Sequence, residues 1–199
     1  MYKVELKDSY FPATKDHSVI NCTIGQLLQK TAVEHRDTEA LVEITQVGKV
    51  ERRWNYHELY EDGLKLSHAL ASRFEKGAHI VVWSPNSHEW VLMEYAAALA
   101  GLVVITANPA LQENELRYII EQSKAVGLFL VSEFRGNPMS QIAEQAISGN
   151  KDIRELTDMN DHAELFRNKT DNRILPNVQP EDAAQIQYTS GTTGFPKGA

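Results

Sequence analysis

Three short apolar runs limit the possible folds of this chain more than any other feature. The runs "HIVVWS", "LVVIT" and "GLFLVS" cover residues 79–84, 102–106 and 127–132. Each is apolar at nearly every position, which is typical of strands buried on both faces of a parallel sheet. Segments of helical periodicity lie between them. This alternation predicts an α/β fold, a mainly parallel sheet flanked by helices.

Before the first of these strands, apolar residues recur every three or four positions, as expected for one face of an amphipathic helix. The stripe consists of Leu59, Gly63, Leu66, Leu70 and Phe74. Asn55 and Glu58 are spaced as in a capping box, which predicts that the helix begins there.

Two further helices are expected between the strands. Asn86 and Glu89 repeat the capping spacing, and they predict a buried helix from Ser87 to about Ala100, ended by Gly101. The next helix presents one apolar face and ends near Gly127. That face consists of Leu116, Ile119 and Ile120.

The remaining segments are shorter or more polar. "EALVEIT" and "KVERRW", on either side of Gly48, predict a β-hairpin. Residues 149–182 are rich in polar and turn-forming residues, and we interpret them as a surface excursion with one short helix. "AAQIQYT" then predicts a return to the sheet as a strand.

Composition excludes several classes of function. With 20 basic and 27 acidic residues among 199, the net charge is −7, which disfavours general binding to nucleic acid. The single cysteine, Cys22, rules out an internal disulfide and favours the cytoplasm. The longest apolar stretch is interrupted by Glu94 and Gly101, so no transmembrane segment is expected. The seven histidines show no metal-ligand spacing, so we expect no metal site.

The last seventeen residues, "AAQIQYTSGTTGFPKGA", point to a ligand. They contain three of the eleven glycines, several hydroxyl residues, Lys197 and no aspartate or glutamate. They follow a predicted strand, where open α/β sheets bind ligands. Backbone N–H groups of such a loop can bind anions, and a lysine adds positive charge. The segment therefore indicates a site for a polyanion such as a nucleotide triphosphate.

Neither of two common phosphate-binding motifs fits this segment. A Walker A loop requires Ser or Thr after its lysine, but Lys197 precedes Gly198. The dinucleotide fingerprint requires glycines two and then three apart. Gly191, Gly194 and Gly198 are three and then four apart, with Pro196 between the last two. An ordinary P-loop NTPase and a Rossmann dehydrogenase are both disfavoured.

The segment "YTSGTTGFPKG" resembles the signature loop of the adenylate-forming superfamily, which includes acyl-CoA synthetases, luciferases and the adenylation domains of peptide synthetases. Upstream, "NYHELYEDGLKLSHAL" and "PNSHEWVLMEYAAALAGLVVITANPALQENELRYIIEQSKA" are similar to other blocks of that superfamily. Within the superfamily, the sequences of these segments are most similar to those of medium- and long-chain fatty acyl-CoA synthetases.

The resemblance implies a reaction in two steps. ATP and a fatty acid form an acyl-adenylate and pyrophosphate, and coenzyme A then displaces AMP, with Mg²⁺ required. It also implies which residues contact the phosphates of ATP: Thr189, Ser190, Gly191, Thr192, Thr193, Gly194 and Lys197. Thr192 and Lys197 are the implied catalytic residues.

The resemblance further implies that residues 1–199 are part of the large N-terminal, AMP-binding domain and end at the phosphate loop. The rest of that domain and the C-terminal domain would then be absent. We expect this chain alone to be inactive and to hold none of these cofactors tightly. The sequence leaves a homodimer open.

Two alternatives to an acyl-CoA synthetase remain. One is another adenylate-forming enzyme: a fatty acyl-AMP ligase, an aryl-CoA ligase or a peptide-synthetase adenylation domain. The other is a non-catalytic α/β interaction module.

Overall fold

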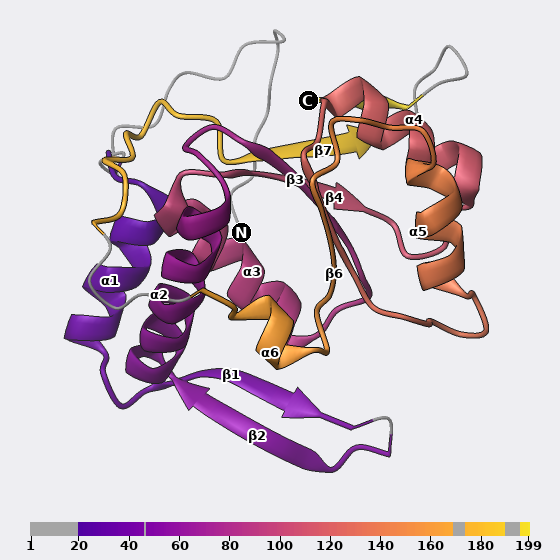
Figure 1. The fold of residues 1–199 in the computed structure, drawn as a ribbon. Coiled ribbons are helices and arrows are strands. Elements are labelled where there is room, and N and C mark those ends of the chain that lie inside the picture. Colours follow the sequence, from indigo (N-terminus) through magenta and orange to yellow (C-terminus); the bar gives the residue numbers. More distant parts are fainter. Residues whose placement is uncertain (1–19, 46, 169–173, 190–195) are drawn as a thin grey trace, which may run out of the picture.

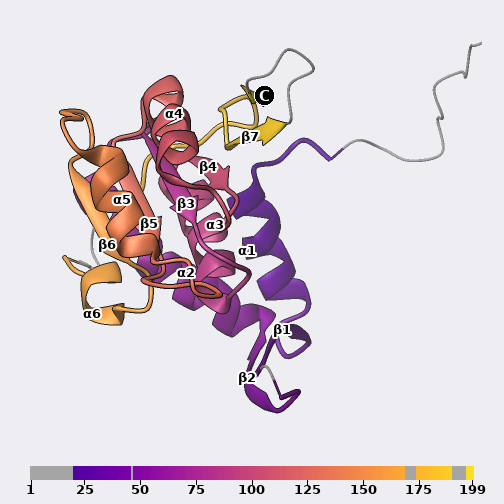
Figure 2. The same cartoon turned by 90° about the vertical axis from the view of Figure 1, so that its right-hand side faces the viewer.

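A computed structural model describes residues 20–45, 47–168, 174–189 and 196–199 of the chain. It has three layers, with a sheet between two groups of helices (Figures 1 and 2). Among the described residues, no helix is both long enough and apolar enough to cross a membrane.

The central sheet has the strand order β6-β5-β3-β4-β7-β8. The pairs from β6 to β7 are parallel, and only the edge pair β7–β8 is antiparallel. The strand bounds are β3 (His79–Trp83), β4 (Val103–Ala107), β5 (Gly127–Leu130), β6 (Glu155–Asp158), β7 (Gln185–Thr189) and β8 (Lys197–Gly198). A separate antiparallel hairpin consists of β1 (Glu39–Ile44) and β2 (Val50–Asn55).

Helices cover both faces of the sheet. Figure 2 shows α4 (Glu113–Ser123) and α5 (Met139–Ile147) on one side. On the other side lie α1 (Ile24–Glu34), α2 (Tyr56–Arg73) and α3 (His88–Ala100). The short helix α6 (His162–Leu165) follows β6.

Alternate residues of each buried strand enter different cores. Ile80 and Val82 of β3 pack into the cluster with α1, α2 and α3. Val81 and Trp83 pack into the cluster with α4 and α5. This two-residue alternation, with apolar residues on both sides, explains why the strand sequences are continuously apolar.

The structure confirms the predicted α/β class, the hairpin, and the strands at β3, β4, β5 and β7. It also confirms the capping box of α2, in which the Asn55 side chain accepts from the Glu58 amide at 2.8 Å. Gly101 ends α3 with a φ of 68°, a left-handed conformation that favours glycine.

Two expectations about helix ends were wrong. The cap of α3 is Ser87, which accepts from the Trp90 amide at 3.2 Å, and not the pair Asn86 and Glu89. The Glu89 carboxylate instead contacts the Nε2 atom of His88. Helix α4 ends at Ser123, because Lys124 adopts a left-handed conformation with φ 53°, and Gly127 already belongs to β5.

Residues 149–182 are not wholly a surface excursion. They include the predicted short helix, α6, but also β6, which pairs in parallel with β5 at the edge of the sheet. Its four residues are polar and charged apart from Leu156, so neither periodicity nor hydrophobicity indicates a strand. Helices α1 and α5 were not predicted from the sequence.

A buried ion pair joins β6 to the rest of the molecule. Glu155 of β6 contacts the Arg73 guanidinium at 2.5 Å, and each side chain is about 5% exposed. The second oxygen of Glu155 accepts from Arg167 at 2.9 Å. Arg73 also donates to the Leu165 carbonyl at 2.7 Å. These contacts connect β6, α2 and the segment around α6.

Candidate nucleotide-binding site at the edge of the sheet

Strands β7 and β8 bring both ends of the glycine-rich segment together. Tyr188 is paired with Gly198, and Thr189 with Lys197. Two backbone hydrogen bonds, of 2.9 and 3.0 Å, join Gln187 to Ala199. The segment therefore leaves the sheet at the carboxyl end of β7 and returns alongside the same strand.

The candidate residues divide into two groups. Thr189 and Lys197 are described, and both side chains are exposed at this edge. Their strands place them opposite each other, with the Thr189 hydroxyl 3.5 Å from the Lys197 carbonyl oxygen. The other candidates lie outside the described residues: Ser190, Gly191, Thr192, Thr193 and Gly194.

Gly198 is required for the close pairing of the two strands. A Cβ atom at this position would lie 2.9 Å from the Ile186 side chain and 3.2 Å from the Tyr188 ring. The first distance is too short for a carbon–carbon contact. A glycine next to Lys197 therefore lets β8 lie against β7.

Helix α4 contacts both ends of the segment. The Tyr118 hydroxyl donates to the Pro196 carbonyl oxygen at 3.1 Å, immediately before Lys197. At the other end, the Tyr188 hydroxyl donates to the Gln122 side chain. Burial raises the pKa of Tyr188, and the neighbouring Tyr118 raises it further, so this hydroxyl keeps its proton at neutral pH. Sequence reasoning missed both α4 residues as part of the site, because only the fold brings them to the loop.

The turn after β4 lies at the same edge. Trp83, at the end of β3, donates from its indole nitrogen to the Asn108 carbonyl oxygen at 2.8 Å. The Asn108 side chain accepts from the Ala110 amide at 2.9 Å. These bonds fix the chain just beyond the carboxyl ends of two central strands, the usual ligand position in open α/β sheets.

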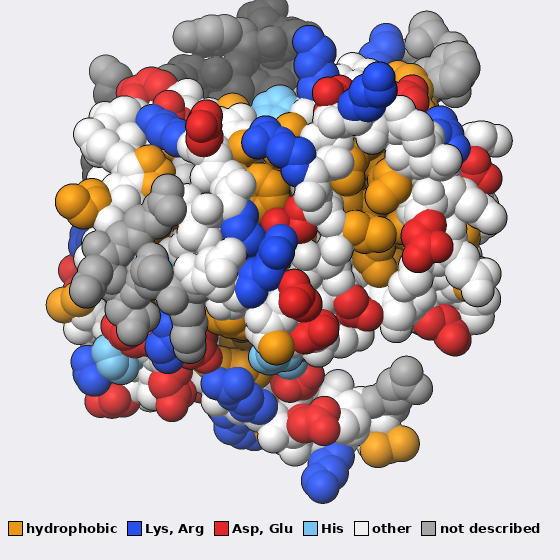
Figure 3. All heavy atoms as spheres, viewed as in Figure 1, with side chains coloured by type: hydrophobic (Ala, Val, Ile, Leu, Met, Phe, Trp, Pro, Cys, Tyr) orange, Lys and Arg blue, Asp and Glu red, His pale blue; other side chains and the backbone are white. Residues whose placement is uncertain are grey.

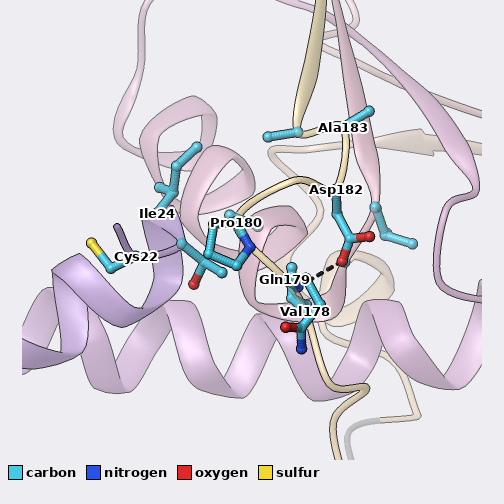
Figure 4. A pocket seen from close by; sticks show the side chains of 12 residues that line it. Cys22, Ile24, Val178, Gln179, Pro180, Asp182 and Ala183 are labelled. Carbon is cyan, nitrogen blue, oxygen red and sulfur yellow. Dashed lines mark hydrogen bonds between the residues drawn. The ribbon is translucent and has the colours of Figure 1, made fainter. Parts of the chain in front are cut away.

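A separate pocket lies at the amino ends of β4 and β7, at the other end of these strands (Figure 4). It is lined by Cys22, the Gly101 end of α3 and the segment before β7 that includes Asp182. Its volume is about 180 Å³, below the roughly 300 Å³ of common ligand sites. Asp182 is bound there by the Gln179 amide at 2.7 Å and by Lys76 at 2.7 Å. We do not assign a ligand to this pocket.

Acidic and basic side chains are interspersed over the face seen in Figure 3, with hydrophobic side chains visible in hollows between them. That face presents no large area of one charge sign.

The family model described as AMP-binding enzyme matches residues 28–199. The chain belongs to this family. The match includes the glycine-rich segment and both strands that border it.

Curated relatives of the chain include mammalian acyl-CoA ligases. The mouse mitochondrial medium-chain acyl-CoA ligase ACSF2 is 29% identical over 219 residues, covering 96% of this chain and 35% of that protein. The bovine protein of the same name is 31% identical, covering 90% of this chain and 33% of that protein. The chain thus spans about a third of the length of these relatives. They are named as mitochondrial, so a cytoplasmic location remains a prediction.

Solved structures share the fold. A long-chain-fatty-acid-CoA ligase from Archaeoglobus fulgidus has a TM-score of 0.77 at 21% identity, covering 96% of this chain and 38% of that one. The N-terminal domain of FACL13 from Mycobacterium tuberculosis has a TM-score of 0.75 at 24% identity, covering 90% of this chain and 44% of that one. The predicted relation to the N-terminal domains of adenylate-forming enzymes is confirmed at the level of the fold.

Proposed function

We propose that the protein carrying this chain is an acyl-CoA synthetase that activates a fatty acid with ATP. The observation that best supports this is the β7–β8 pairing, which places Thr189 and Lys197 opposite each other at the carboxyl edge of the sheet. A polyanion bound between the loop and this edge would meet a lysine and no carboxylate of residues 183–199. The medium-chain ligases among the relatives support a fatty acid as the substrate.

In the proposed first step, a carboxylate oxygen of the fatty acid attacks the α-phosphorus of ATP. The bond to the β-phosphate breaks, and pyrophosphate leaves. Lys197 would neutralise charge that develops on the leaving group, and the hydroxyls of Thr189, Ser190, Thr192 and Thr193 would donate to the phosphates. Gly191 and Gly194 would let the loop backbone approach them.

In the proposed second step, the thiolate of coenzyme A attacks the acyl carbonyl, and AMP leaves. Mg²⁺ would neutralise phosphate charge during the first step. The chain spans only about a third of its relatives, so we place the residues for magnesium, adenine and coenzyme A elsewhere in the whole protein. We likewise propose that residues 1–199 belong to its N-terminal AMP-binding domain.

Carboxylate-dependent exchange of labelled pyrophosphate into ATP tests this proposal on the whole protein. The panel would contain fatty acids of different chain length, aryl acids and amino acids. Exchange with fatty acids, followed by thioester formation with free coenzyme A, is the expected result. Exchange only with aryl or amino acids would assign another adenylate-forming activity. No exchange with any carboxylate would contradict adenylation and favour a non-catalytic module.

A further inference from the structure

A second group of polar side chains gathers away from the β7–β8 pair, where three separate segments meet. Glu43 comes from the hairpin strand β1, His88 and Glu89 begin α3, and His162 begins α6. Figure 1 shows the hairpin and α6 on the same side of the molecule, next to α3. Nothing in the adenylate-forming reaction proposed above uses these residues.

Three donor atoms converge within this group. The Nε2 atom of His88 lies 2.9 Å from Glu89 Oε1, and the Nε2 atom of His162 lies 3.4 Å from the same oxygen. One nitrogen or oxygen atom from each residue lies within 4.8 Å of the others. Tetrahedral zinc, with bonds of about 2.0–2.2 Å, holds its ligand atoms about 3.3 Å apart. The two distances to Glu89 are close to that value.

The contacts of His88 indicate that a positive charge, either a second ring proton or a metal ion, lies between its ring and the two carboxylates. Its Nδ1 atom lies 2.8 Å from Glu43 Oε1, while its Nε2 atom faces Glu89. A neutral imidazole has only one N–H. If Nδ1 donates to Glu43, the lone pair of Nε2 points at a carboxylate oxygen, and the two repel unless a proton or a metal ion lies between them. A carboxylate on the far nitrogen of a histidine is also the usual partner that orients a metal ligand.

The surroundings suit a bound ion. Only 8% of the Glu89 side chain and 14% of the His88 side chain are exposed. The Trp54 ring lies 5.1 Å from the His88 ring, and the Phe166 ring stacks on His162 at 6.0 Å. The His162 side chain is 55% exposed, so it is free to adjust toward a metal and leaves an entry path.

We propose that His88, Glu89 and His162 form a binding site for a divalent transition metal ion of the zinc class, with Glu43 as the residue that orients His88. Two imidazoles and one carboxylate favour such an ion over magnesium or calcium, which prefer oxygen ligands alone. Three protein ligands leave a fourth position for water. The ion would link α3 to α6 directly and to the hairpin through Glu43.

The expectation of no metal site came from the spacing of the histidines. His88 and His162 are far apart in the sequence, and Glu43 lies in a third segment, so spacing along the chain could not reveal the group. Only the packing of the hairpin, α3 and α6 brings them together.

Calorimetric titration with Zn²⁺ and absorption spectroscopy with Co²⁺ test the site on chelator-treated protein. A Cys22→Ser background removes the thiol, which lies by the C-terminal end of α3. The variants are His162→Gln, Glu43→Gln and the control His35→Gln, which changes an exposed histidine of the loop after α1. Because His162 is exposed, His162→Gln should leave the fold intact, which circular dichroism of the metal-free protein would check.

We expect one Zn²⁺ per chain in the background protein and in His35→Gln, and d–d bands of four-coordinate Co²⁺. His162→Gln should weaken binding by at least about 10-fold, and Glu43→Gln by about 10- to 100-fold. Zn²⁺ should raise the melting temperature of the background protein but not that of His162→Gln. Absence of stoichiometric binding, or equal binding by His162→Gln, would overturn the proposal and leave a proton as the bridging cation.

Discussion

At the scale of single residues, Lys197 is the described side chain on which the proposed activity depends most. It is exposed and lies opposite Thr189 at the end of the sheet. Replacing it with alanine removes a charge-assisted hydrogen bond to phosphate, for which typical values are about 1.5–3 kcal/mol. We therefore expect Lys197→Ala in the whole protein to lower the pyrophosphate-exchange rate about 10- to 150-fold. Lys49→Ala, at an exposed position of the hairpin, is the matched control, and an equal loss in both variants would refute a specific role.

Tyr118 is expected to position the segment without touching the substrate. Its hydroxyl donates to the Pro196 carbonyl, so Tyr118→Phe removes a bond next to Lys197 and keeps the ring. The loss of one neutral hydrogen bond predicts a fall of about 2- to 12-fold in kcat/KM for ATP. A purely structural role would lower the melting temperature and leave the KM for ATP unchanged. Tyr60→Phe, on α2, provides the comparison and should change neither kinetic constant.

At the scale of elements, β6 depends on Glu155. This carboxylate compensates the buried Arg73 and also binds Arg167. Glu155→Gln would leave a buried guanidinium without its counter-charge, a change that typically costs about 3–5 kcal/mol. Denaturant unfolding of this variant should show a loss of that size. Glu164→Gln, an exposed partner of Arg167, should cost less than about 1 kcal/mol, and similar losses in both would contradict the account.

The hairpin is joined to α2 through the side chain of Asp62. Its carboxylate accepts from the Trp54 indole at 3.1 Å, from Arg52 at 3.0 Å and from Lys65 at 3.1 Å. Partial burial alone would raise the pKa of Asp62. The hydrogen bonds from Lys65 and Trp54 and the nearby positive charges outweigh it, so the pKa lies below its usual value.

Because the pKa of Asp62 is lower in the folded protein than in the unfolded chain, where it is about 3.9, the ionised carboxylate stabilises the fold at pH values above about 3.9. That contribution is lost as the pH falls through the lower pKa of the folded state. Asp62→Asn should therefore lower the free energy of unfolding by about 1 kcal/mol at pH 7. Its difference from the unmodified protein should shrink below about pH 4. A difference independent of pH between 7 and 3 would exclude this ionic contribution, and urea unfolding at several pH values measures it.

Elements with strong local signals could be predicted, and those without could not. The Asn55 capping box and the apolar strands specify their structure within a few residues of sequence. Strand β6 is stabilised by partners distant in sequence, above all Arg73, so its own residues indicate a polar loop. The cap of α3 was misplaced by one residue because Asn86 and Ser87 are both good capping residues, and the local sequence does not choose between them.

At the scale of the whole molecule, the mainly parallel α/β class and the family could both be predicted from patterns in the sequence, whereas the strand order could not. The motif "YTSGTTGFPKG" identifies the family without any structure, and the family match to residues 28–199 confirms it. The contacts of Tyr118 and Gln122 with that segment, and the meeting of Glu43, His88, Glu89 and His162, arise only from tertiary packing. A homodimer stays a prediction, which light scattering of the purified protein would check.

The most direct test of the central claim follows an oxygen atom from the carboxylate to AMP. The whole protein would be incubated with ATP, coenzyme A and a fatty acid labelled with ¹⁸O in both carboxylate oxygens, and the AMP analysed by mass spectrometry. If an acyl-adenylate forms, the attacking oxygen stays on phosphorus when coenzyme A displaces AMP, so each AMP should carry one ¹⁸O. Thioester formation with unlabelled AMP, or with ADP as the product, would contradict adenylation.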